Sequence, residues 1–380
     1  MGQTTKKEYL IAIWGRYHRV GRRFKSKILD EFCSVCGYAR KYAIALLRRK
    51  PGRRRRNPGP KRRYEAQVLA PLKAIWLASE QMCSKRLKAA LPLWLPFYEG
   101  QYGALPPSVR RQLLQISPAT IDRLLKKVRA RYPGKGLSGT RPGSLLKHQI
   151  PIRTDNHDIH QPGFLEADTV AHCGSSMAGD FIWSVTFTDL YSQWTENRAI
   201  WNKGAKDVLE QVKDLEQRLP FALQGFDVDN GSEFLTFHLW RYLLDRARPV
   251  PLTRSRPYRK NDQAHVEQKN WTHVRQLLGY QRLETPQLRP AINELYRTWG
   301  LLHNFFCPSL KLLTKIRQGS KTIRTYSPPQ TPAQRLLDCP NLTPEQKDKL
   351  RSQLQQLNPL RLKEEVEQQL KRVLNAKQAR

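Results

Sequence analysis

Hydrophobic side chains recur at intervals of three and four over the first 50 residues. Tyr9, Ile13 and Tyr17 fall on one helical face, and two further apolar-periodic segments meet at Cys36 and Gly37. This spacing predicts amphipathic helices, and a helix, a glycine turn and a basic helix in succession are typical of a helix-turn-helix unit. An ordinary helical hairpin is the alternative interpretation. We therefore expect residues 1–50 to form a small all-α unit.

A second helical unit is predicted over residues 64–133. Ser117 can cap its last helix, and Pro118 then takes the first helical position. A basic helix that follows a short turn is typical of proteins that place this helix in the major groove of DNA. The predicted DNA contacts on this helix are Arg123, Lys126 and Lys127.

The hydrophobic pattern changes to short β-rich runs after Phe164. The predicted strands are 165–172, 181–189, 195–201, 223–231 and 249–254, and the predicted helices are 203–219, 237–247, 264–280 and 286–306. Three strands, a helix, a strand, a helix, a strand and further helices form a mixed α/β order. We expect a mixed five-stranded sheet whose first three strands are an antiparallel meander.

The end of the chain is basic and then helical. Residues 321–325 are β-prone, and two helices are predicted on either side of Asn358-Pro359. The last helix carries an apolar stripe formed by Leu362, Val366, Leu370 and Val373. This stripe packs either against its own chain or against a second copy. The predicted boundaries are a helix-turn-helix unit at 1–50, a basic arm at 51–63, a second unit at 64–133, a linker at 134–160, an α/β core at 161–305, a basic segment at 306–340 and a helical tail at 341–380.

The chain is strongly basic, which indicates a polyanionic partner. Its 380 residues, too many for one ordinary domain, include 67 Lys and Arg against 32 Asp and Glu, for a net charge of +35. Nucleic acid is the simplest partner for such a charge. In residues 48–63, ten of sixteen side chains are Lys or Arg and three are Pro, so a stable helix is excluded. This arm suits insertion into a DNA minor groove, and a solvated linker is the alternative. Its predicted DNA contacts are Arg53, Arg54, Arg55 and Arg56.

The cysteines and the apolar runs exclude two other classes of protein. Six cysteines are scattered along the chain, and Cys33 and Cys36 form one CxxC without a second pair beside it. Because a structural zinc site needs four ligands, no zinc is predicted, and reduced thiols are expected. No apolar run approaches the roughly 18 residues of a membrane span. We expect a cytoplasmic protein that is associated with the nucleoid when bound to DNA.

Three carboxylates occupy positions that suit divalent metal ions. Asp168 lies in a predicted strand, Asp229 in an Asn-Gly turn after a strand, and Glu267, after 37 intervening residues, in a predicted helix. Two Mg²⁺ ions roughly 3.5–4 Å apart activate the nucleophile and stabilise the leaving oxygen in phosphoryl transfer. Mg²⁺ binds oxygen ligands. The pattern alone leaves the choice open, because Glu166 shares the strand face of Asp168 and Asp227 that of Asp229. Gly231 in the turn is expected at positive φ.

The segment DNGSEF, which begins at Asp229, and the later Glu267 resemble the integrase-type core shared by retroviral integrases and many bacterial insertion-sequence transposases. The segment PYRKNDQAHVEQKNW, at 257–271, is similar to the stretch around the glutamate in one branch of these transposases, and TPAQRLL more loosely to its end. The resemblance covers about residues 160–305. It implies an RNase H-like fold and a triad of Asp168, Asp229 and Glu267 that holds two Mg²⁺ ions, with Mn²⁺ as an alternative.

The chain departs from this family in two places. Retroviral integrases carry a His2Cys2 zinc unit before the core, and this sequence does not, so zinc is not implied. Some transposases have Lys or Arg seven residues after the glutamate, where this chain has Val274 between His273 and Arg275. The residue that grips the transposon end is therefore not assigned.

The resemblance implies a DNA transposase. Such an enzyme binds the terminal repeats of its element as a homo-oligomer on double-stranded DNA, hydrolyses the phosphodiester at the element end and joins the 3′-OH to target DNA. A domesticated DNA-binding regulator with an inactive core is the first alternative, and an RNase H-type nuclease is the second. Further DNA contacts are predicted at Arg254, Arg256, Arg259, Lys260, Asn270 and Arg275.

Overall fold

The computed structural model divides the chain into two compact units, residues 1–63 and 64–380. The structure describes residues 1–51, 64, 66–131, 159–229, 231, 233–255, 264–318 and 321–378. The predicted contacts Arg53 to Arg56, Arg256, Arg259 and Lys260, and nearly all of the predicted linker, lie outside these residues.

The first unit is a three-helix bundle, as its hydrophobic pattern predicts. Its helices are α1 (Gln3–Arg19), α2 (Arg22–Cys36) and α3 (Arg40–Arg48). Phe32, Ala43 and Leu47 are fully buried between them. Gly37 ends α2 in the left-handed conformation at φ 66°, and its N–H donates to the Cys33 carbonyl at 2.8 Å. A residue without a Cβ takes this conformation at little cost, so the glycine turn is where the sequence predicts it.

The second unit opens with four helices. They are α4 (Ala66–Ala78), α5 (Ser84–Tyr102), α6 (Pro107–Gln115) and α7 (Pro118–Arg129). The predicted cap of α7 is confirmed, since the Ser117 hydroxyl accepts a hydrogen bond from the Thr120 backbone N–H at 3.3 Å. Ile121 and Leu125 bury one face of α7. The opposite face exposes Arg123, Lys126 and Lys127.

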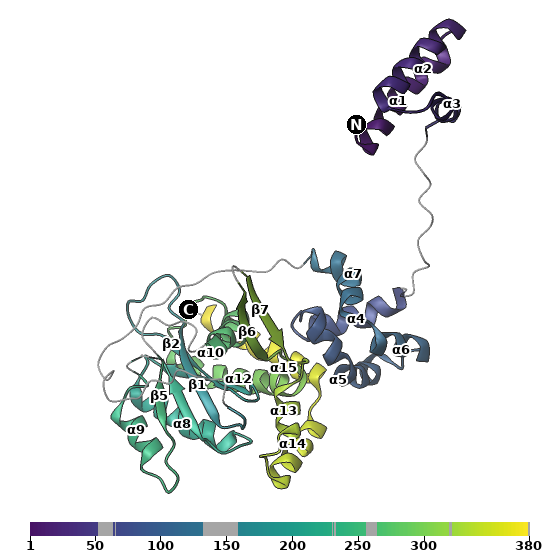
Figure 1. Cartoon of the computed structure of the whole chain (residues 1–380). Helices are drawn as coiled ribbons and strands as arrows, with labels where there is room; N and C mark the ends of the chain where they lie inside the picture. The colour runs from purple at the N-terminus through teal and green to yellow at the C-terminus, as the bar shows by residue number, and fades with distance from the viewer. Residues whose placement is uncertain are drawn as a thin grey trace. The chain divides into compact units, whose positions relative to one another are not determined.

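The second unit contains a mixed five-stranded sheet (Figure 1). Its strands are β1 (Phe164–Ala171), β2 (Ile182–Asp189), β3 (Thr195–Trp201), β4 (Gly225–Val228) and β5 (Leu252–Arg254), in the order β3-β2-β1-β4-β5. The first three strands form the predicted antiparallel meander, and β4 and β5 add in parallel beside β1. This arrangement is consistent with an RNase H-like core.

Helices pack around the sheet between and after its later strands. They are α8 (Ala205–Arg218), α9 (Phe237–Leu244), the segment formed by α10 (Ala264–Lys269), η1 (Asn270–Arg275) and α11 (Gln276–Leu278), the short turn η2 (Pro286–Leu288) and α12 (Arg289–Phe306). The predicted helices are confirmed, with one difference. The segment η1 is a π-helix, which the sequence pattern does not distinguish from an α-helix.

The C-terminal region contains a hairpin and three helices. These are β6 (Leu312–Gln318) paired with β7 (Lys321–Tyr326), α13 (Pro332–Asp338), α14 (Pro344–Gln356) and α15 (Pro359–Gln378). Val366 and Val373 of the predicted stripe are buried, and α15 packs against α12 of its own chain. The stripe is therefore part of the core of the protomer, which confirms the first of the two predicted alternatives, packing against its own chain.

Side chains of the early helices contact the later part of the second unit. The Trp94 indole N–H of α5 donates to the Phe306 carbonyl of α12 at 2.9 Å, and Lys363 of α15 pairs with Glu80. The helices of residues 66–129 and the α/β core thus share one hydrophobic core. Among the described helices, none combines the length and the apolar composition needed to cross a bilayer.

Candidate active site

Two of the predicted acids lie next to each other, Asp168 within β1 and Asp229 just after the parallel strand β4. The register of β1 and β4 pairs Glu166 with Asp227 and Ala167 with Val228. One residue further, Asp168 stands beside Asp229 where β4 ends. Side chains two apart on a strand share a face, so this pair follows from the register.

The Asp168 carboxylate is held by two donors and crowded by other acids. Its Oδ1 accepts from the Thr169 backbone N–H at 2.7 Å, and its Oδ2 accepts from the Asn270 amide at 2.6 Å. The Asp168 carboxylate is largely buried, and the carboxylate of Asp229 lies nearby. Burial, with smaller effects from Asp229, Glu267 and Glu233, raises the pKa of Asp168 to about 7. The free site therefore has an excess of negative charge.

Asp229 is held by the turn that follows β4. Its Oδ1 accepts from the Gly231 backbone N–H at 2.8 Å. Burial and the charge of Glu233 raise the pKa of Asp229 to about 6, against the opposing charge of Lys203. The positive φ expected at Gly231 stays a prediction, because this angle also depends on Asn230, which lies outside the described residues. An added Cβ at Gly231 would stand 2.7 Å from both Asp229 Oδ1 and Glu233 Oε2, so the two carboxylates would have to shift.

Glu267 reaches the site through the anchoring of its helix to β1. Glu166 Oε2 accepts from the Val266 backbone N–H in the first turn of α10 at 3.0 Å. First-turn N–H groups of a helix have no acceptor within the helix, so a carboxylate there satisfies a donor and favours the helix dipole. Glu267 is the next residue, and its charge contributes to the raised pKa of Asp168. The π-helix begins three residues later, and such turns are frequent at functional sites.

The two remaining acids of the pattern have structural partners. Glu166 is fully buried beneath the start of α10, and Asp227 Oδ1 accepts from the Thr253 hydroxyl of β5 at 2.6 Å. Both acids therefore tie neighbouring elements to the central strands. Asp168 and Asp229 differ from them in facing each other.

A further carboxylate, Glu233, lies at the same place and was missed by the sequence analysis. Its Oε1 accepts from the Thr169 hydroxyl and pairs with Lys203 Nζ, both at 2.7 Å. The side chain is 1% exposed. Glu233 follows Asp229 by four positions in DNGSEF, and this closeness could have nominated it as a site residue. A polar residue after a turn is commonly exposed to solvent, however, so the sequence does not distinguish the two cases. No sequence signal links Lys203 to this position.

The side chains at this site offer the type of ligand atom that a hard divalent cation prefers. All four acids offer carboxylate oxygens, which Mg²⁺ and Mn²⁺ accept as ligands. Glu233 Oε2 and Asn270 Oδ1 are buried and have no hydrogen-bond partner among the described residues. No group of three or more His, Cys, Asp and Glu side chains in the described ranges is already arranged as an ion cage. The side chains of these acids would therefore have to rotate to close around an ion.

The predicted DNA contacts occupy different environments. Arg254 ends β5 and is 8% exposed, so it is not part of an open loop. Asn270 donates to Asp168 within the site. Arg275 lies half-buried over the Tyr280 ring at 4.7 Å. Only the three basic residues of α7, among the predicted contacts that are described, form an exposed group.

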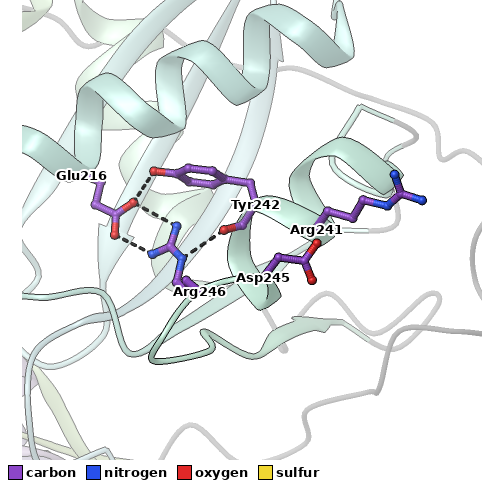
Figure 2. Close-up of a pocket in the computed structure, with 5 residues that line it drawn as sticks. All are labelled: Glu216, Arg241, Tyr242, Asp245 and Arg246. Carbon is purple, nitrogen blue, oxygen red and sulfur yellow. Dashed lines mark hydrogen bonds and ion pairs between the residues drawn. The ribbon is translucent and has the colours of Figure 1, made fainter.

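A shallow hollow between α8 and α9 lies apart from these acids (Figure 2). Glu216 at its edge accepts from Tyr242 Oη at 2.6 Å and from the two terminal nitrogens of Arg246 at 2.7 and 3.3 Å. Both of its carboxylate oxygens are thus satisfied by its neighbours. Glu216, Tyr242 and Arg246 of this hollow thus pair with one another, which indicates a structural role for them.

Comparisons with known proteins identify a relative. No protein-family model matches the chain. A crystal structure of the catalytic core domain of BIV integrase is 19% identical over 31% of this chain and 70% of that chain, with a TM-score of 0.24. The uncharacterized protein y4rM of Sinorhizobium fredii is 38% identical over 342 residues, which cover 88% of this chain and 96% of y4rM. The chain belongs to the same protein family as y4rM.

Proposed function

We propose that this protein is a DNA transposase of the Asp-Asp-Glu type. The observation that carries the proposal is that Asp168 of β1 stands beside Asp229 at the end of the parallel strand β4. Glu267 is delivered by a helix that is anchored to β1. The DNGSEF segment and the spacing to Glu267 support the same assignment. The strongly basic composition supports a nucleic-acid substrate.

Each residue of the proposed triad has a role that follows from its position. Asp168, Asp229 and Glu267 would hold two Mg²⁺ ions. When bound, these ions supply an activated oxygen nucleophile and stabilise the leaving oxygen at a phosphodiester. Asn270 fixes the Asp168 carboxylate, and Gly231 leaves room for Asp229 to approach. The first nucleophile is water at the element end, and the second is the freed 3′-OH.

The helical parts of the chain would bring DNA to this site. The face of α7 with Arg123, Lys126 and Lys127 is exposed, and the first unit is a small helical bundle with a glycine turn. We propose that both bind the terminal repeats of the element. One chain supplies a single DNG turn with a following Glu267, so joining two ends to one target requires at least two protomers.

A strand-transfer assay tests the proposal. The full chain is incubated with labelled DNA from the ends of its element, with a target plasmid, and with Mg²⁺ or Mn²⁺. We expect nicking at the element end and joined products from the wild type, and neither from Asp229→Asn. A wild type that binds the ends but never cleaves would favour the DNA-binding regulator. Equal products from both proteins would remove the triad assignment.

A further inference from the structure

We propose that Glu233 is a fourth carboxylate of the active site, facing the bound metal ions, and that Lys203 is its counter-ion when metal is absent. The inference rests on the proposed metal-dependent function. It adds to the Asp-Asp-Glu triad a fourth metal ligand, Glu233, and a positive charge, Lys203.

The first observation is an unpartnered oxygen. Glu233 Oε1 is shared by the Thr169 hydroxyl and Lys203 Nζ, whereas Oε2 is buried and has no hydrogen-bond partner among the described residues. A buried carboxylate oxygen without a donor is destabilising, because it has lost its hydrogen bonds to water without replacement. Glu216 has a comparable cation and hydroxyl as partners, yet both of its oxygens are satisfied. Among the buried side-chain atoms of the described residues that have no hydrogen-bond partner, Glu233 Oε2 is the one carboxylate oxygen.

The second observation is the direction of this oxygen. Glu233 Oε2 and Asp229 Oδ1 each lie 2.7 Å from the point where a Cβ of residue 231 would stand. They flank the same face of Gly231, and Asp229 is the neighbour of Asp168 across the strands. Glu233 Oε1 meanwhile binds Thr169, the residue after Asp168. The Glu233 carboxylate thus reaches both β1, which carries Asp168, and the turn after β4, which carries Asp229.

The third observation concerns charge. Four carboxylates carry four negative charges, which two divalent cations would balance. Without metal, Lys203 opposes part of this charge, and its ammonium also lies over the Trp183 ring at 4.2 Å. Asn202 and Lys203 both adopt left-handed backbone at φ 51° and 53°, a conformation that is strained for residues with a Cβ. This strained turn after β3 directs the lysine to Glu233.

The test is Mn²⁺ binding to the full chain, measured by the EPR signal of free Mn²⁺. We expect Glu233→Gln to weaken binding by about tenfold or more, in the range typical of residues that support a metal site. Glu216→Gln is the matched control, because it neutralises a paired carboxylate outside the site, and it should bind as the wild type does. Asp229→Asn should lose binding.

The outcomes separate this inference from the proposed function. If Asp229→Asn loses Mn²⁺ and Glu233→Gln binds like Glu216→Gln, then Glu233 is only a structural ion-pair partner and the inference is wrong. If Asp229→Asn also binds normally, the proposed function fails. Should Glu233→Gln not fold, Glu233→Asp keeps the charge but shortens the side chain, and we expect the same weakening from a folded protein.

Lys203→Met provides a second readout, without DNA or turnover. In EDTA the variant should unfold at a lower temperature than the wild type, because four carboxylates lose their counter-ion. Mn²⁺ should restore most of that loss, since the ions replace the missing charge. An equal gain in unfolding temperature from Mn²⁺ in both proteins would overturn the role given to Lys203.

Discussion

Glu166 and Val266 are joined by a 3.0 Å hydrogen bond across 100 residues of chain, from the carboxylate at the middle of β1 to the first turn of α10. Four residues later, Asn270 donates to Asp168, two residues after Glu166. Two strand residues advance about 6.6 Å and four helical residues about 6 Å. The strand therefore holds the helix at two matching points, and Glu267 lies between them.

We predict that Glu166→Ala weakens this anchorage. The loss of a buried charge-assisted hydrogen bond should lower the free energy of unfolding by about 1.5–3 kcal/mol. It should also reduce strand cleavage, because Glu267 loses its fixed position. Glu166→Gln keeps an acceptor oxygen and should recover part of both. Glu210→Ala on the exposed face of α8 is the control for urea denaturation and for cleavage. If the Glu166→Ala protein cleaved DNA as well as this control does, the anchoring role of Glu166 would be contradicted.

Asp229→Asn should stabilise the metal-free protein at pH 8 while it removes cleavage. A carboxyl group whose pKa is raised on folding binds more protons in the folded state. The contribution of Asp229 to the free energy of unfolding is thus most favourable at low pH, and it is lost as the pH rises from about 4 towards about 6. The shift in the pKa of Asp229 from 3.8 to about 6 corresponds to at most about 3 kcal/mol of unfolding free energy.

The measurement is thermal unfolding in EDTA at pH 4.5 and pH 8. The advantage of Asp229→Asn over the wild type should be largest at pH 8 and shrink at pH 4.5. Asp348→Asn, at an exposed position on α14, should show no such trend. The same gain at both pH values would mean that charge repulsion at the site is not its cause.

Removal of the basic face of α7 should weaken DNA binding. The triple variant of Arg123, Lys126 and Lys127 to Ala should bind element-end DNA less tightly. Its affinity should also depend less steeply on salt, with the slope reduced by about 1 for each lost phosphate contact. A control variant with the same charge change at exposed positions replaces Lys349, Lys371 and Arg372.

Binding is measured by fluorescence anisotropy over a series of salt concentrations. The α7 variant should also discriminate less between element-end and random DNA than the control variant does. Identical affinities and slopes for the two variants would assign the specific contact to another part of the chain.

Trp94→Ala should destabilise the whole second unit, because the side chain is fully buried between α5 and the end of α12. Deletion of a buried tryptophan costs about 3–5 kcal/mol. Trp240→Ala, at a 40% exposed position on α9, should cost much less. Urea denaturation followed by fluorescence and circular dichroism decides this. If Trp94→Ala affected only the helices before the core, those helices would form an independent domain.

The local pattern of apolar, polar and turn-forming residues in the sequence determined much of this fold. The five strands, the meander, the glycine turn at Gly37 and the cap at Ser117 all follow from local periodicity and turn chemistry, because these depend on neighbours in the chain. The triad residues were nominated by motif and spacing, and they remain a proposal. The π-helix after Glu267 was not predicted, since its hydrophobic spacing is close to that of an α-helix.

Only the tertiary structure separated residues that the pattern treats as equal. Glu166 and Asp168 share a strand face. The packing of α10 gives Glu166 a backbone donor, whereas the pairing of β1 with β4 gives Asp168 an acidic neighbour, Asp229. The stripe on α15 is apolar whichever surface covers it, and α12 covers it here. Lys203 meets Glu233 across 30 residues through a left-handed turn. Such contacts depend on how distant elements pack, and no local preference of the chain encodes them.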